Sequence, residues 1–137
     1  MNDVFKMQLR DIQPSQLYIS SEKLVSVMAA GHDKPLEPVP IKRLSGRVIY
    51  TDGHTRALVA HLTGCSEISV YWDKDELDWE AYQICMDWCV SEGITSISDL
   101  KDRVIPPEEY QILWLDRCRV MHDKLRVNSS ENKSPEY

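Results

Sequence analysis

The chain has 137 residues, 42% of them hydrophobic, which is enough apolar material for one ordinary globular core. Its formal net charge of -6 argues against broad electrostatic binding to DNA or to an anionic membrane, because both require a basic surface. No run approaches the roughly 18 consecutive apolar residues of a membrane span, and the first residues lack a signal-peptide pattern, so we expect a cytoplasmic protein with no membrane partner.

The four cysteines carry no metal-site signature. Cys85 and Cys89 lie one helical turn apart, but no second pair with metal-ligand spacing accompanies them. In a small chain without an export signal, cysteines are usually reduced and often buried. We therefore expect reduced thiols in the core and predict no metal-binding residues.

The first elements follow from periodicity. Apolar and polar residues alternate from Phe5 to Leu9, which predicts a strand that ends near Ile12. A short helix is predicted over residues 22–30, with Ser20 and Ser21 as candidate caps and Gly31 at its end. Pro40 suggests that the next strand, residues 39–44, lies at a sheet edge.

A hairpin and a strand-turn-helix unit are predicted next. Ser45-Gly46 separates two apolar runs, which is typical of a β-hairpin. The second run ends at Asp52-Gly53, a helix follows as far as Gly64, and residues 68–72 again alternate as a strand. This order predicts a compact α+β unit over residues 1–75.

The remaining sequence is mainly helical. Apolar residues recur at helical spacing from Leu77 to Cys89, and Pro107 fits the first turn of a long amphipathic helix that continues to Leu125. We expect residues 76–126 to form a helical extension packed on the α+β core. A pair of such helices could also make a homodimer. Residues 127–137 contain little apolar surface and predict a disordered tail.

The segment after the second hairpin strand is the strongest functional candidate. Gly53 permits a sharp turn, and the helix behind it would direct its first N–H groups and positive dipole end at one point. Arg56 can bind phosphate with two N–H groups, Thr55 adds a hydroxyl, and His54 can transfer a proton. Asp52 would repel a phosphate unless it holds Mg²⁺, contacts a hydroxyl or acts as a base.

A simpler interpretation of the same residues stays open. Asp-Gly is a common turn pair, Asp52 could be a helix cap, and Arg56 could pair with an acid at the surface. Local spacing does not decide between a turn and a binding site.

The sequence Asp52-Gly53-His54-Thr55-Arg56, placed between a strand and a helix, is very similar to the second motif of the ParB N-terminal domain and sulfiredoxin fold group. Residues 11–17 resemble the first ParB-type box, and residues 38–41 and 64–70 resemble the strands around the two helices of that fold. The resemblance covers about residues 8–73. It implies a ParB/sulfiredoxin-like small mixed sheet with helices.

The resemblance also implies a ligand. In this group the second motif binds nucleotide phosphates: CTP in ParB, ATP in sulfiredoxin, and ADP or ATP in the free serine kinases, whose Asp-Gly-His version is the most similar. We expect Gly53, His54, Thr55 and Arg56 to bind the phosphates of ATP, ADP or CTP, with or without Mg²⁺. Asp52 and His54 would be the catalytic residues of a small-molecule phosphotransferase.

Two departures limit the activity that the resemblance implies. Sulfiredoxins have a reactive cysteine where Gly53 stands, so sulfinic acid reduction is not expected. The serine kinases use an acidic residue in or near the first box as base, whereas Ser15 and Gln16 follow Pro14 here. The alternatives are a DNA-associated ParB-like partition or nuclease-type protein, which the net charge disfavours, and a non-catalytic interaction module.

Overall fold

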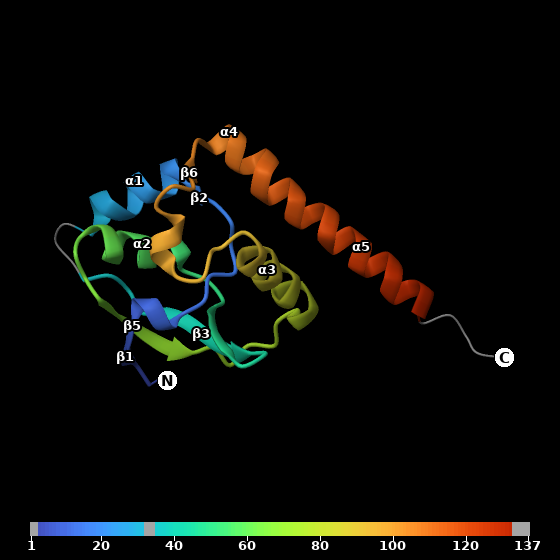
Figure 1. The fold of residues 1–137 in the computed structure, drawn as a ribbon, viewed down its shortest axis with the longest axis horizontal. Helices are drawn as coiled ribbons and strands as arrows, with labels where there is room; N and C mark the ends of the chain where they lie inside the picture. Colours follow the sequence, from blue (N-terminus) through green and yellow to red (C-terminus); the bar gives the residue numbers. More distant parts are fainter. Residues whose placement is uncertain (1–2, 32–34, 133–137) are drawn as a thin grey trace.

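A four-stranded mixed sheet forms one layer of the molecule, and α2 packs on one of its faces (Figure 1). The computed structural model describes residues 3–31 and 35–132. The strand order is β1-β5-β3-β4, with β3 parallel to β5 and the other two pairs antiparallel. The strands are β1 (Phe5–Gln8), β3 (Val39–Leu44), β4 (Arg47–Tyr50) and β5 (Glu67–Trp72). The predicted α+β class is confirmed.

The hairpin between β3 and β4 has the predicted turn. Ser45 and Gly46 both have positive φ, at 50° and 77°, as a type I′ turn requires. The expected edge position of Pro40 is wrong, because β3 lies between β5 and β4. Pro40 is the second residue of the strand, and its carbonyl accepts a hydrogen bond from the Thr51 amide at 3.1 Å. An internal strand therefore tolerates this proline close to its start.

Two helices and a short second sheet complete the first half. Helix α1 (Ser21–Ala30) ends at Gly31 as predicted, and α2 (His54–Leu62) follows the Asp52-Gly53 turn. Strand β2 (Ile19–Ser20) pairs in parallel with β6 (Val104–Ile105). This pairing joins the first half of the chain directly to the C-terminal extension.

The extension contains helices α3 (Trp79–Ser91), α4 (Pro107–Tyr110) and α5 (Asp116–Asn132). A 3₁₀ turn, Ile97–Leu100, begins with a capping box at Ser96. A π-helical stretch, Gln111–Leu115, connects α4 to α5. Pro107 is at the first helical position, as predicted.

One hydrophobic core is shared by the sheet, α2 and the extension. Leu58 of α2 and Leu100 of the 3₁₀ turn are both fully buried in it, together with Val70 of β5. Gln13 adds a polar connection, because its buried side chain donates to the Ile94 carbonyl at 2.7 Å and accepts from Arg47 Nη1 at 2.9 Å. The extension is packed on the α+β core through both kinds of contact.

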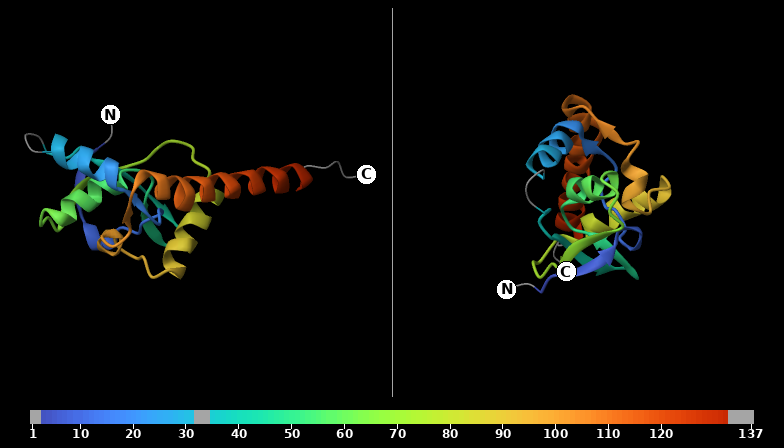
Figure 2. Two further views of the ribbon diagram at one scale, coloured as in Figure 1. Left: turned by 90° about the horizontal axis from the view of Figure 1, so that it is seen from above. Right: turned by 90° about the vertical axis from the view of Figure 1, so that its left-hand side faces the viewer.

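Helix α5 extends well beyond the body of the molecule (Figure 2). The predicted disordered tail is wrong for residues 127–132, which continue this helix; residues 133–137 lie outside the described part of the chain. Once a helix is nucleated, each added residue gains a hydrogen bond at small cost, so polar residues can prolong it. No helix in the described ranges combines the length and apolar character that a membrane crossing demands.

Candidate functional site

The turn before α2 has a geometry that only glycine meets without strain. Gly53 has φ 79° and ψ 20°, and its amide donates to the Asp52 carboxylate at 2.8 Å. A β-carbon at this position would lie 2.8 Å from Val39 Cγ1 and 2.9 Å from Arg56 Nη2. Glycine is therefore required by both the backbone angle and the close approach of β3 and Arg56.

The N-terminus of α2 presents unpaired backbone donors. The first hydrogen bond of the helix runs from the Ala57 amide to the Gly53 carbonyl at 3.0 Å. The amides of His54, Thr55 and Arg56 thus precede the helical ladder, and no side chain in the described residues caps them. Three N–H groups and the positive end of the helix dipole converge in front of this turn.

A cavity of about 300 Å³ lies at this helix end. All five predicted site residues, from Asp52 to Arg56, contribute to its walls. Helix α1 adds Lys23 and Glu22 to the walls, and Tyr110 comes from the extension. The cavity therefore places two cationic side chains, Lys23 and Arg56, around the free amides, with the carboxylates of Asp52 and Glu22 also at its walls.

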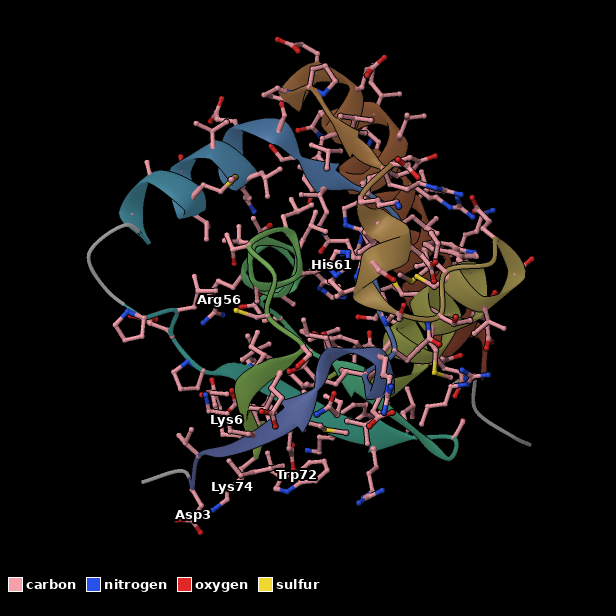
Figure 3. All side chains as sticks on the ribbon, turned by 60° about the vertical axis from the view of Figure 1, so that its left-hand side comes forward. Asp3, Lys6, Arg56, His61, Trp72 and Lys74 are labelled. Carbon is pink, nitrogen blue, oxygen red and sulfur yellow. The ribbon has the colours of Figure 1, made fainter. Side chains whose placement is uncertain are left out.

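Arg56 is held in place by the segment that leads into β3 (Figure 3). Its Nη1 donates to the Pro38 carbonyl at 2.9 Å and lies 4.0 Å from the Glu37 carboxylate. The side chain is about one quarter exposed, at 24%. These contacts fix the guanidinium through Nη1 alone, so the planar group keeps other donors for a ligand.

His54 connects the turn to the segment after β1. Its Nε2 accepts a hydrogen bond from the Ser15 amide at 2.9 Å, and the Ser15 hydroxyl donates to the Tyr50 carbonyl at 2.8 Å. The imidazole packs against the Tyr50 ring with 5.2 Å between centroids. Burial lowers the pKa of His54 to about 4, against an opposing effect of the Asp52 carboxylate. At neutral pH the ring is uncharged and carries its proton on Nδ1.

Asp52 also contributes to a second chamber. This chamber of about 280 Å³ lies between the α+β core and helices α3 and α5, and it shares Gln16, Asp52 and His54 with the first cavity. Nearby, Tyr82 donates its hydroxyl to the Thr51 carbonyl at 2.8 Å. Asp52 is thus the charged residue common to both chambers.

Six residues of the cavity were not predicted as site residues from the sequence: Gln16, Glu22, Lys23, Ser26, Val27 and Tyr110. Gln16 Nε2 donates to the Tyr110 hydroxyl at 3.0 Å, and Lys23 Nζ lies 6.0 Å from the centre of the Tyr110 ring. Tyr110 follows the apolar pattern of its helix, which indicates core rather than a site. These residues belong to chain segments that are far apart in the sequence and meet only in the folded protein. No local sequence pattern therefore identifies them as site residues.

Comparisons with known proteins establish the fold only. No protein-family model matches the chain, and no curated protein matches it. A solved structure, that of protein Atu1540 from Agrobacterium tumefaciens, is similar over 72% of this chain with a TM-score of 0.51 and 15% sequence identity. The match covers 61% of the Atu1540 chain, so this chain corresponds to part of that protein.

Proposed function

We propose that the cavity at the N-terminus of α2 binds the phosphates of a nucleotide, ATP, ADP or CTP. The observation that carries the proposal is the set of three uncapped amides, of His54, Thr55 and Arg56, within a cavity that also contains the Lys23 ammonium. Backbone N–H groups at a helix start are a recurrent phosphate site. The similarity of the Asp52–Arg56 sequence to the ParB and sulfiredoxin motif supports the same ligand.

The shape of the turn fits this ligand. A β-carbon on residue 53 would collide with Val39 and Arg56. Because glycine has none, the backbone of Gly53 and the Arg56 guanidinium can lie close together. A cavity of about 300 Å³ is at the lower end of the range for small-molecule sites. It suits the phosphate part of a nucleotide, with the rest of the molecule extending toward the opening.

If the protein turns over its ligand, Asp52 is the residue placed for chemistry. One of its carboxylate oxygens accepts from the Gly53 amide. The other is left to hold Mg²⁺ or to accept a proton from the hydroxyl of a substrate bound in the second chamber. A bound nucleoside triphosphate would supply a transferable phosphoryl group. The role of His54 in this proposal is to position the turn, because its Nε2 is already bonded to Ser15.

Isothermal titration with ATP, ADP and CTP, each with and without Mg²⁺, tests the proposal. We expect one of them to bind with a stoichiometry of one, and Arg56→Ala to weaken that binding at least tenfold while the variant keeps its circular dichroism spectrum. Arg119→Ala is the matched control, because this arginine is exposed on α5 and does not line the cavity. The proposal is wrong if none of the three nucleotides binds or if both variants bind as the wild type does.

A further inference from the structure

Helix α1 lies beside a second cavity, which is separate from the candidate nucleotide site. Helices α1 and α2 lie side by side above β5 and β1 (Figure 1). Residues of these four elements line a cavity of about 780 Å³, which we call the α1–β5 cavity. It shares no lining residue with the cavity in front of Gly53. Its volume is within the range of small-molecule sites.

The lining of the α1–β5 cavity is mainly apolar. Helix α1 contributes Val25, Met28 and Ala29, whose spacing of three and four residues places them on one face of the helix. Val25 is 66% exposed and Met28 is 43% exposed. Val59 of α2 and Ile68 of β5, which are both buried, also line the cavity. The protein thus leaves an apolar stripe of α1 exposed beside an apolar cavity.

Helix α1 gains little stability from the packing of its own side chains. None of its residues, from Ser21 to Ala30, is buried. Lys23 and Val27 line the cavity in front of Gly53, so α1 has a cavity on each of two faces. Helices of this length are marginal in water without burial of an apolar face. An apolar molecule in the α1–β5 cavity would supply that burial.

The polar groups of the α1–β5 cavity come largely from the sheet. Lys6 of β1 and Ser69 of β5 both line it, and they are register partners. Side chains opposite each other in an antiparallel pair lie about 5 Å apart on the same face, so the ammonium and the hydroxyl can donate to one acceptor group. Within residues 3–31 and 35–132, Lys6 makes no ion pair. Glu67, the one carboxylate of the lining, is opposite Gln8.

We propose that the α1–β5 cavity binds an amphipathic carboxylate, a molecule with a linear apolar chain and one carboxylate group, such as a medium-chain fatty acid. The chain contacts Val25, Met28 and Val59, and the carboxylate accepts hydrogen bonds from Lys6 and Ser69. Two neighbouring donors suit an anionic head group better than the single Glu67 carboxylate suits a cationic one. The proposal goes beyond nucleotide binding and does not depend on it, because the two cavities have no residue in common.

Isothermal titration of the full chain with laurate, below the concentration at which laurate forms micelles, tests the proposal. We expect one laurate to bind per chain. Decanoate, which has two fewer methylene groups, should bind about tenfold more weakly, because each buried methylene adds to the affinity. Dodecyltrimethylammonium, with a chain of the same length but a cationic head group, should bind more weakly than laurate.

Variants of exposed residues separate the apolar contact from the charged one. Met28→Glu should weaken laurate binding at least tenfold, and Val127→Glu, at an exposed position of α5, is the matched control. Lys6→Ala should weaken binding about tenfold. Glu67→Gln should strengthen it, because the substitution removes a repulsive carboxylate. Circular dichroism of each variant checks that it is folded.

Four results would overturn the proposal: no laurate binding to the wild type, tighter binding of dodecyltrimethylammonium, weaker laurate binding by Glu67→Gln, or unchanged binding by Met28→Glu. Sedimentation equilibrium gives a further check. A dimer that Met28→Glu dissociates and laurate does not would identify a second copy of the chain, and not a carboxylate, as the occupant. Titration of Met28→Glu with ATP, ADP and CTP should match the wild type, so failure of this proposal is distinguishable from failure of nucleotide binding.

Discussion

The Ser15 amide donates a 2.9 Å hydrogen bond to Nε2 of His54, and this bond joins the segment after β1 to the first residue of α2. Both residues are buried, so the acceptor must stay unprotonated for the bond to persist. His54 thereby connects two segments that are almost forty residues apart. The sequence suggested that His54 transfers a proton, whereas in the structure it is a buried hydrogen-bond acceptor.

This bond predicts a loss of stability in mild acid. The folded-state pKa of His54, about 4, is below the ordinary value of 6.5, so the unfolded chain binds a proton first. Stability is fully present above pH 6.5 and falls as the pH drops from 6.5 toward 4. We expect a loss of about 2 kcal/mol between pH 7.5 and pH 5 from this residue alone.

Urea unfolding of the wild type and of His54→Gln across this pH range measures the effect. Glutamine keeps an acceptor close to the Nε2 position but does not titrate. The variant should therefore show a flatter pH dependence, and the difference between the two curves isolates His54 from other ionisable groups. Parallel curves would contradict the assignment.

Gly53→Ala should be more destabilising than Gly46→Ala. Both glycines have positive φ, at 79° and 77°, so both variants carry backbone strain of about 1–3 kcal/mol. At Gly53 the new β-carbon also collides with atoms of Val39 and Arg56. At Gly46 no atom lies within 4 Å of the new β-carbon. Thermal unfolding of the two variants provides the measurement, and equal shifts in Tm would show that the approach at Gly53 is not tight.

Lys23→Ala should weaken nucleotide binding about tenfold, the effect of losing one charge-assisted contact of about 1.5 kcal/mol. The ammonium contributes to the cavity from α1, but an exposed side chain on that helix is not needed for folding. Lys124→Ala, exposed on α5, is the charge-matched control. The two variants are compared by titration at low and high salt. A loss for Lys23→Ala that does not shrink at high salt would argue against a charge effect.

Leu100→Ala should destabilise the whole molecule by about 2–5 kcal/mol, because it empties a fully buried position. Leu100 belongs to the extension but packs in the core shared with α2, so the two halves should unfold in one transition. Tryptophan fluorescence and far-ultraviolet circular dichroism should give coincident urea curves for the variant. Separate midpoints would show that the extension unfolds by itself.

The sequence predicted the elements with strong local signals. The alternation from Phe5 to Leu9, the Ser45-Gly46 turn and the Asp52-Gly53 turn each depend on neighbouring residues. Both turns are confirmed, and the first strand forms over Phe5–Gln8 but ends before the predicted Ile12, where Leu9–Asp11 form a 3₁₀ turn. The strand order was not predictable in this way, because β1 pairs with β5 through contacts about sixty residues apart. Pro40 shows the limit of such local predictions. Proline generally prefers edge strands, but here it lies in an internal strand because it is close to the start of that strand.

The same limit applies to the site. Residues 52–56 are contiguous, so their chemistry could be recognised together. Lys23 and Tyr110 reach the cavity only because α1 packs beside α2 and because β2 pairs with β6. Two-residue strands have no measurable periodicity, so nothing in the sequence signalled that pairing.

The pairing of β2 with β6 also has a consequence for biosynthesis. A ribosome delivers Ile19 long before it delivers Val104, and Tyr110 emerges later still. The nascent chain can therefore form the turn at Gly53 and the start of α2 well before Tyr110, another wall residue of the cavity, has been made. The complete cavity appears only after Tyr110 has been made and has packed beside the helices α1 and α2 that were made before it.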